Sequence, residues 1–300
     1  MSISHYLKEI GRGRDGARAL DRAQAADLMG QILDGHVSDL ELGAFCIAMR
    51  IKGETDQEMA GFLDATHARL RPISASSPVV VLPSYNGARK LPVLTPLLAH
   101  LLAREGLAVV MHGTPTESTR VTSQDVLAAM GITPLHQPCA VQAGSVVFAP
   151  TEVLCPSLKR LLDVRRVVGL RNPAHSLVKL MNPTTEVEAL LVSSYTHPEY
   201  AISMAATLTL TGARAMLLRG TEGEVVADAR RTPHMEAFVH GTQTPLVEAQ
   251  AGSLLKLPEL PTAIDAAHTA RYTQAVLHGE LPVPAPLATQ VQAVLKAFTL

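Results

Sequence analysis

The 300-residue chain contains no tryptophan, and aromatic residues make up only 3% of it. Proteins that hold single-stranded nucleic acid by stacking its bases need interleaved aromatic side chains, so this composition argues against that class. No apolar run approaches the roughly 20 residues that a helix needs to cross a bilayer. Residues 1–5 lack the basic start and the apolar stretch of a secretory signal. We therefore expect neither a membrane partner nor secretion.

Cysteine is also scarce, because the chain has only Cys46, Cys139 and Cys155. Their odd number and wide spacing predict neither a disulfide framework nor a zinc signature. The 12 histidines form no HExxH motif and no cluster with cysteine, which is how a histidine metal site would show itself. We expect a cytoplasmic protein, in which thiols stay reduced, with no metal site and no cofactor.

Charged residues account for 18% of the chain, whereas hydrophobic residues account for 47% and favour a large buried core. The net charge of −1 argues against a uniformly basic nucleic-acid binder. The charges are unevenly distributed, however. Residues 1–80 hold 9 basic and 11 acidic residues, residues 81–180 hold 10 and 5, and residues 181–300 hold 7 and 11. The middle third is therefore basic, with a net charge of +5.

The first seventy residues have the signals of several short helices. The apolar residues of 28–33 repeat with helical spacing. Ser38 with Glu41, and Thr55 with Glu58, form capping boxes, in which the two side chains satisfy free N–H groups at a helix start. These motifs predict helices that begin near residues 39 and 56.

After Pro72 the pattern changes to an alternation of short apolar runs and helical segments. We expect strands over residues 79–82, 107–111, 189–193 and 215–218. We expect helices over residues 96–104, 122–131 and 198–210, and a tail at 265–300 that is helical between its prolines. Alternating strands and helices predict a parallel sheet with crossover helices. The fold class is therefore α/β, with a small N-terminal α-helical bundle and a larger α/β domain around a mainly parallel central sheet.

Polar residues follow the first two expected strands. The carboxyl ends of parallel strands are where such folds bind ligands. The residues in these two loops are Asn86, Gly87, Arg89, Lys90, His112, Gly113 and Arg120. Taken alone, the first loop is more typical of an ordinary solvated connection, and the second also matches a plain connection from strand to helix.

Residues 159–179 contain six cations and a single acid, Asp163. A solvated helix usually alternates the two signs of charge, and this segment does not. Guanidinium groups bind phosphate in a bidentate manner, so the pattern favours a phosphate-bearing partner. The six cations are Lys159, Arg160, Arg165, Arg166, Arg171 and Lys179.

Three blocks resemble the superfamily of anthranilate phosphoribosyltransferase and the class II nucleoside phosphorylases, which has the glycosyltransferase family 3 fold. The first, L-G-A-F…A-M-R-I-K-G-E-T, spans residues 42–55. Residues 110–127 resemble the family pattern K-H-G-N…S-S-K…A-D-V-L, and residues 169–183 resemble G-V-R-T…L-x-N-P. The resemblance implies a helical dimerisation domain at 1–71, completed by part of 155–185, an α/β domain at 78–300, and a homodimer.

The chain departs from that family where the family binds phosphate and magnesium. Its G-T-G-G-D turn is replaced by P-S-Y-N-G at residues 83–87, and its phosphate-binding lysine by Met111. The magnesium-binding Asp-Glu pair aligns with Val225 and Val226, and apolar side chains cannot bind the metal. A shifted register would bring Glu224 or Asp228 to the metal position.

New cations stand in the same loops, and together these features resemble the YbiB-type DNA-binding branch of the superfamily. This resemblance implies a homodimer that binds DNA without sequence preference in a basic groove, on a catalytically degenerate transferase scaffold. The DNA-binding residues would be Arg89, Lys90, Arg120, Lys159, Arg160, Arg165, Arg166, Arg171 and Lys179. The remnant of the family's ligand site would be Asn86, Gly87, His112, Gly113 and Asn182.

Two alternatives remain open. One is an active phosphoribosyltransferase or nucleoside phosphorylase with an altered substrate, which would rest on His112, Gly113, Arg171 and Asn182. The other is an interaction protein whose basic patch binds an acidic protein partner.

Overall fold

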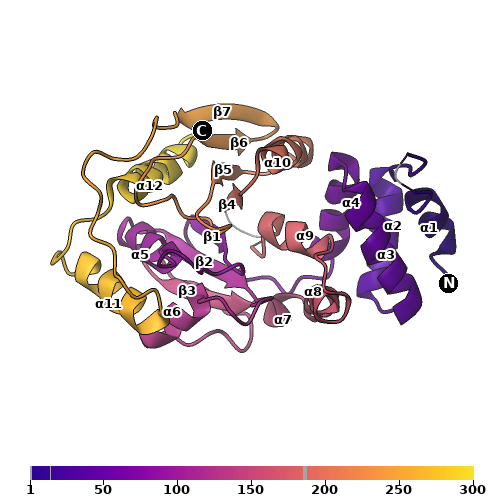
Figure 1. The fold of residues 1–300 in the computed structure, drawn as a ribbon, viewed down its shortest axis with the longest axis horizontal. Helices are drawn as coiled ribbons and strands as arrows, with labels where there is room; N and C mark the ends of the chain where they lie inside the picture. Colours follow the sequence, from indigo (N-terminus) through magenta and orange to yellow (C-terminus); the bar gives the residue numbers. More distant parts are fainter. Residues whose placement is uncertain (1, 14, 185–187) are drawn as a thin grey trace.

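The computed structural model describes residues 2–13, 15–184 and 188–300. A helical bundle forms one end of the molecule (right in Figure 1), and an α/β domain forms the rest. This architecture confirms the expected fold class. The bundle consists of α1 (Ser4–Ile10), α2 (Arg22–Leu33), α3 (Asp39–Lys52) and α4 (Asp56–His67).

Local hydrogen bonds explain where the bundle helices begin. The Ser38 hydroxyl accepts a bond from the backbone N–H of Glu41 at the start of α3, and Thr55 does the same at α4, so both predicted capping boxes are confirmed. A third box, which begins α2 at Asp21, was not predicted. Between the helices, the rings of Phe45 and Phe62 pack edge to face in the core.

Seven strands form one sheet in the order β3-β2-β1-β4-β5-β6-β7. The first five pair in parallel, as predicted, and the last two are antiparallel. The hairpin between β6 and β7 turns at His240 and Gly241, both with positive φ. The strands are β1 (Val79–Pro83), β2 (Ala108–Gly113), β3 (Val146–Pro150), β4 (Ala189–Tyr195), β5 (Ala215–Arg219), β6 (Met235–Val239) and β7 (Thr242–Val247).

Helices cover both faces of the sheet. Along β1, Val80 and Leu82 belong to the apolar cluster on the α5 side, whereas Val79 and Val81 belong to the cluster on the α9 side. The helices of this domain are α5 (Thr95–Arg104), α6 (Ser123–Ala129), α7 (Thr151–Leu154), α8 (Pro156–Val168), α9 (Ala174–Leu180), α10 (Pro198–Thr211), α11 (Ala266–Leu277) and α12 (Ala285–Ala297).

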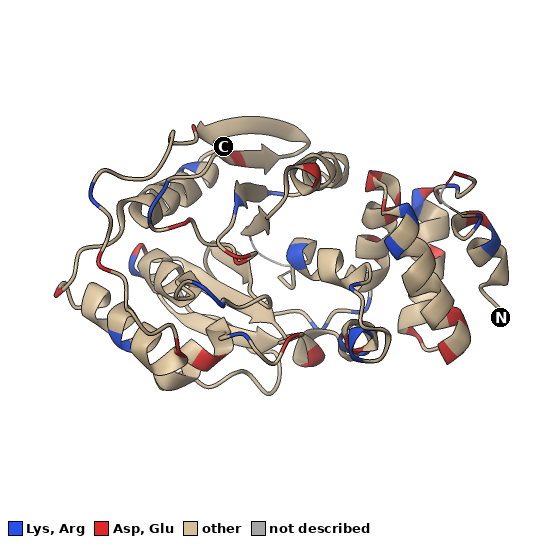
Figure 2. Ribbon diagram, in the orientation of Figure 1, with Lys and Arg blue, Asp and Glu red and all other residues tan. Residues whose placement is uncertain are grey.

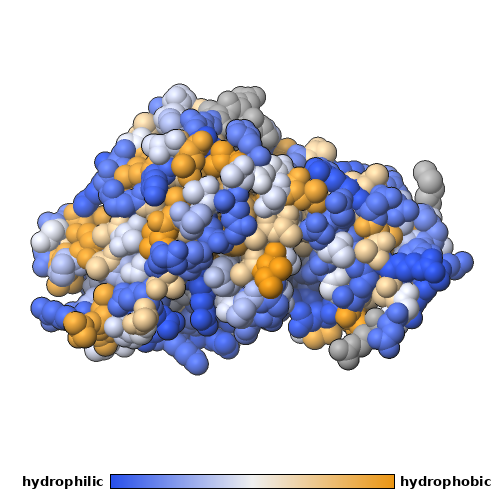
Figure 3. Space-filling model, turned by 90° about the horizontal axis from the view of Figure 1, so that it is seen from above, coloured by the Kyte–Doolittle hydropathy of each residue, from blue (hydrophilic) through white to orange (hydrophobic). Residues whose placement is uncertain are grey.

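The helical bundle and the sheet are joined by one apolar core. Phe45 of α3, Leu161 of α8 and Val81 of β1 belong to the same buried cluster. Helices α8 and α9 lie between the bundle and the sheet (Figure 1). On the face shown in Figure 3, apolar side chains lie in small groups among hydrophilic ones. In the part of the chain that the structure describes, no helix combines the length and apolarity that a bilayer crossing requires.

Candidate functional site

The candidate site lies at the carboxyl ends of the parallel strands, on the side of the sheet that faces the bundle. Three connections meet there: the loop of residues 84–91 after β1, the loop of residues 114–122 after β2, and the β5–β6 loop, whose first part is residues 220–226. Charged residues of both signs gather between the sheet and the bundle (Figure 2). The location agrees with the general rule for parallel sheets.

Glu224 of the β5–β6 loop points its carboxylate into the loop after β1. Its Oε1 accepts hydrogen bonds from the backbone N–H groups of Asn86 at 2.9 Å and Gly87 at 2.8 Å. Its Oε2 accepts from three hydroxyl groups: Ser84, Thr95 at 3.0 Å and Ser123 at 3.4 Å. The glutamate and the three hydroxyl residues are buried. We call these five donor groups the anion cradle.

Glu222, two residues earlier, holds the next part of the same loop. Its carboxylate accepts from three consecutive backbone N–H groups, those of Arg89, Lys90 and Leu91, at 2.9–3.0 Å. The Asn86 side chain adds a bond to the Glu222 carbonyl at 2.8 Å. The carboxylates of Glu222 and Glu224 therefore accept hydrogen bonds from five backbone N–H groups of the loop that follows β1.

Magnesium-bound phosphoribosyl pyrophosphate, which the family resemblance implies for active members, does not fit these residues. Val225 and Val226 are buried in the apolar cluster beneath α5 and α12 and offer no ligand atoms. Glu224 is bound to the anion cradle, and Asp228 pairs with Arg230 at 2.8 Å. A shifted register therefore does not restore the metal site through either acid, and we derive no step through the metal.

Beside the anion cradle, three arginines meet around one acid. Glu117 lies 3.0 Å from Arg120 Nε, 2.8 Å from Arg165 Nη2 and 3.5 Å from Arg171 Nη2. Partial burial alone would raise the pKa of Glu117, but the bonds from Arg165 and Arg120 outweigh it and lower the pKa to about 2. One carboxylate thus faces three guanidinium groups, and the group keeps a net positive charge. We call Arg120, Arg165 and Arg171 the basic cluster.

The basic cluster is bonded directly to the loop that carries Arg89 and Lys90. Arg120 donates to the Gly87 carbonyl at 3.2 Å, and Arg171 donates to Asn86 Oδ1 at 3.0 Å. The side chains of Arg89 and Lys90 are exposed, since it is only their backbone N–H groups that bind Glu222. The structure therefore brings five of the nine predicted cations to one region.

The remaining cations of α8 lie elsewhere. Lys159 and Arg166 both pair with Asp163, the one acid of the segment, so this face of the helix has less positive charge than the sequence alone indicated. Arg160 points toward the bundle and donates to the Leu33 carbonyl at 3.3 Å. These three residues do not join the basic cluster.

Lys179 of α9 faces inward. Its ammonium donates to the carbonyl of Ser194 at 2.8 Å and to that of Gly223 at 3.3 Å. Burial lowers the pKa of Lys179 to about 8, although the nearby Glu224 carboxylate opposes this shift. Lys179 therefore holds the β5–β6 loop in place through its ammonium group and lines the pocket described next.

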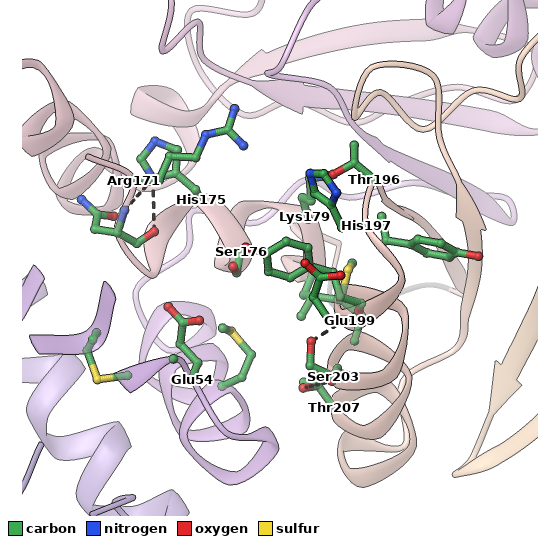
Figure 4. A pocket seen from close by; sticks show the side chains of 18 of the residues that line it. Glu54, Arg171, His175, Ser176, Lys179, Thr196, His197, Glu199, Ser203 and Thr207 are labelled. Carbon is green, nitrogen blue, oxygen red and sulfur yellow. Dashed lines mark hydrogen bonds between the residues drawn. The ribbon is translucent and has the colours of Figure 1, made fainter. Parts of the chain in front are cut away.

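A pocket of about 450 Å³ opens between the bundle and the α/β domain. Figure 4 shows Glu54 reaching it from the bundle, Arg171, His175 and Lys179 from around α9, and Glu199 from α10. Burial raises the pKa of Glu54 and lowers that of His175 to about 4, so in both groups burial acts against the charged form. Arg171 is the link between this pocket and the basic cluster.

The other residues predicted as a remnant of the ligand site are His112, Gly113 and Asn182, and each makes close contacts within the fold. His112 is fully buried and its Nε2 lies 3.1 Å from the Met181 carbonyl. Gly113 allows close approach of the loop after β1, because a Cβ there would lie 2.4 Å from the Ser84 carbonyl oxygen. Asn182 accepts from Thr184 and lies beside the bundle.

Sequence reasoning missed the acids of the site. Glu117 and Glu222 were not singled out, and Glu224 was considered only as a metal ligand. A signal for Glu117 was present, since it is the one acid between His112 and Arg120. No sequence pattern pointed to Glu222.

Comparison with known proteins agrees with the fold. Residues 4–69 match the family model for the glycosyl transferase family, helical bundle domain. The chain is 42% identical to the uncharacterized protein YbiB of Escherichia coli K12, over 99% of this chain and 94% of that protein. It is 30% identical to the anthranilate phosphoribosyltransferase of Symbiobacterium thermophilum, over 91% of this chain and 81% of that enzyme.

Among solved structures, the anthranilate phosphoribosyltransferase of Thermus thermophilus superposes with a TM-score of 0.72 at 24% identity, over 95% of this chain and 85% of that one. The yeast enzyme in complex with PRPP and Mg superposes with a TM-score of 0.68 at 13% identity, over 99% and 88%. These two likenesses show the shared fold. Together with the sequence identities, they show that the chain belongs to the glycosyl transferase family 3, or anthranilate phosphoribosyltransferase-like, superfamily.

Proposed function

We propose that this protein binds nucleic acid, with DNA as the partner to test first, through the basic cluster and the exposed Arg89 and Lys90. The observation that supports this most strongly is the meeting of three guanidinium groups around the single carboxylate of Glu117. Guanidinium groups bind phosphate oxygens in pairs, and phosphate contacts dominate the affinity of proteins for nucleic acids.

The proposed binding is electrostatic and independent of sequence. Cations that contact phosphates position a protein on nucleic acid without distinguishing its bases. The absence of tryptophan and the scarcity of aromatic residues favour this mode over base stacking. The proposal also agrees with what the resemblance to the DNA-binding branch implies, and we propose with it the cytoplasmic location and the absence of a cofactor that the cysteine and histidine pattern predicts.

The anion cradle is filled by Glu224, which favours nucleic-acid binding over phosphoribosyl transfer as the function of this protein. Glu224 takes up the N–H groups of Asn86 and Gly87, which are at the position of the family's pyrophosphate-binding turn. A transferase would bind phosphoribosyl pyrophosphate in the presence of magnesium. Isothermal titration with both therefore distinguishes the two functions, and we expect no heat of binding.

We also propose that the protein is a homodimer that associates through the bundle. One face of α3 carries three exposed apolar side chains, those of Leu40, Ile47 and Ile51. Large apolar side chains grouped on an exposed face often mark an interaction surface. A second copy of the chain would cover them. Such an arrangement gives the assembly two basic clusters.

Charge reversal tests the proposed binding surface. The variant with Arg89→Glu and Lys90→Glu should bind a labelled DNA oligonucleotide more weakly than wild type. If each residue contacts one phosphate, its plot of log K against log salt should be shallower by about 2. The control variant combines Lys256→Glu and Lys296→Glu, which changes the net charge equally at two exposed lysines away from the basic cluster.

The comparison has a clear negative outcome. Equal loss of affinity in both double variants would show that binding depends on net charge and not on this surface. An unchanged affinity in the Arg89 and Lys90 variant would exclude these two residues from the interface. Binding of an acidic protein but no nucleic acid would favour the interaction-protein alternative.

A further inference from the structure

We propose that Glu224 is a built-in substitute for a bound phosphate group, and that the anion cradle keeps the donor set of an oxyanion site, which the Glu224 carboxylate fills. Removal of the Glu224 side chain would then create a binding site for inorganic phosphate or pyrophosphate. This inference does not depend on the proposed nucleic-acid binding. It concerns a closed site inside the protein, next to the basic cluster.

The donors of the cradle are those that an oxyanion requires. The backbone N–H groups of Asn86 and Gly87 both point to one oxygen of the carboxylate, and the hydroxyl groups of Ser84, Thr95 and Ser123 point to the other. Backbone N–H groups can only donate, so they select for an anion or another acceptor. Successive N–H groups in such a turn form a recognised anion-binding concavity.

The Glu224 carboxyl group is buried and is surrounded by neutral hydrogen-bond donors. Glu224 is 1% exposed, yet each of its five hydrogen-bond donors is an uncharged group. The ammonium of Lys179 lies close enough to feel its charge but donates its hydrogen bonds to the carbonyls of Ser194 and Gly223. An unpaired buried charge is costly unless hydrogen bonds replace its hydration, and the cradle does this.

The β5–β6 loop is shaped to deliver this carboxylate. Glu222 has a φ of 52°, a conformation that non-glycine residues rarely adopt, and Gly223 follows with a φ of 90°. The three bonds from the backbone of residues 89–91 to the Glu222 carboxylate offset that strain. At Gly223 a Cβ would lie 2.0 Å from Nδ2 of Asn86, so the Asn86 side chain, which binds the Glu222 carbonyl, would have to move.

An exogenous anion therefore competes with a tethered one. The tethered carboxylate is always present at a high effective concentration, so free phosphate should not displace it in the wild-type protein. Substitution of Glu224 by alanine removes the CH2–COO− group from the cradle and leaves the backbone N–H groups of Asn86 and Gly87 without their acceptor. A phosphate ion would satisfy the same donors.

The test measures thermal unfolding of the full chain in inorganic phosphate and in pyrophosphate, against sodium chloride of equal ionic strength. We expect Glu224→Ala to be less stable than wild type in chloride. Phosphate should then raise its Tm by about 2–4 °C once its concentration is about ten times the dissociation constant. Wild type and the control Glu248→Ala, at an exposed position on the surface, should show no such specific rise.

Two outcomes would overturn the inference. One is a Glu224→Ala protein that folds and gains no more from phosphate than wild type does. The other is wild-type protein that gains as much as the variant, which would mean that the cradle is open. Glu224→Gln separates the filling of the cradle from its charge, because the amide still occupies the same space. We expect this variant to be less stable than wild type and to bind no more phosphate.

Native-state hydrogen exchange tests the inference even if Glu224→Ala does not fold. In wild type without added anions, the amides of Asn86 and Gly87 should exchange slowly, because the carboxylate already binds them. Fast exchange that becomes slow on addition of phosphate would contradict the inference. These readouts do not involve nucleic acid, so their failure would leave the proposed function untouched.

Discussion

Arg165 donates from Nη2 to Oε1 of Glu117 at 2.8 Å and so joins the end of α8 to the loop after β2. Arg120, from the same loop as Glu117, and Arg171, from the segment between α8 and α9, approach the same carboxylate. Glu117 is therefore the centre on which the basic cluster is assembled. It holds the three arginines in place and also cancels part of their charge.

This double role predicts that Glu117→Gln strengthens nucleic-acid binding while it weakens the fold. Loss of the negative charge leaves three guanidinium groups free to attract phosphates, so we expect a severalfold higher affinity at equal salt. We expect the free energy of unfolding to fall by about 1–2 kcal/mol, because hydrogen bonds to a charged acceptor are lost. Fluorescence anisotropy and urea unfolding measure the two effects, with Glu248→Gln as an exposed control. A lower affinity would contradict this account.

The buried histidines predict that stability falls at mildly acidic pH. Burial lowers the pKa of His112 to about 4, from an ordinary value of 6.5, so the unfolded chain binds a proton that the folded chain does not. This contribution is complete above pH 6.5 and is lost as the pH falls toward 4. For His112 we expect about 1–2 kcal/mol less stability at pH 5 than at pH 8. Urea unfolding should show that the free energy of unfolding depends less on pH in His112→Gln than in wild type. An equal dependence on pH in the two proteins would contradict this prediction.

Gly87→Ala should destabilise the protein more than the same substitution does at another glycine with positive φ. Gly87 has a φ of 65°, and a Cβ there would lie 2.6 Å from the backbone oxygen of Val121. Strain and the steric clash together should cost about 3 kcal/mol. Gly131→Ala is the matched control, since it has a φ of 84° but open space around it, and should cost only about 1–2 kcal/mol. Chemical unfolding compares them, and equal losses would show that the loop can move away.

The exposed apolar face of α3 predicts a dimer that should dissociate when charged residues are placed on that face. Ile47→Glu combined with Ile51→Glu places two carboxylates where we propose that a second copy packs. We expect light scattering to give a dimer mass for wild type and a monomer mass for the variant, with an unchanged circular dichroism spectrum. A wild-type monomer at micromolar concentration would contradict the proposed dimer.

Much of the fold could be predicted because its signals are local. The capping boxes at Ser38 and Thr55 place helix starts through contacts within three residues. The hairpin of β6 and β7 was not predicted, because its turn at His240 and Gly241 lacks the Asn-Gly or Asp-Gly pair that usually marks such turns. Strand β3 was missed as well, although its residues 146–150 are mostly apolar.

The site could be predicted only in part because its contacts are distant in sequence. Arg165 and Arg171 were identified as cations, but their shared partner Glu117 lies 48 and 54 positions away in the loop after β2. The bond between Gly87 and Glu224 spans 137 positions. Its donor is a backbone N–H, which every residue except proline has, so side-chain patterns could not reveal it.

The most direct test of the proposed function is the salt dependence of DNA binding by the wild-type protein. Fluorescence anisotropy would follow binding to labelled duplexes of about 20 base pairs, in two unrelated sequences, from low to physiological salt. We predict equal affinity for both sequences and a linear fall of log K with log salt, with a slope near −0.9 for each phosphate neutralised. No detectable binding at low salt, or binding that salt does not weaken, would contradict the claim that this basic surface binds nucleic acid.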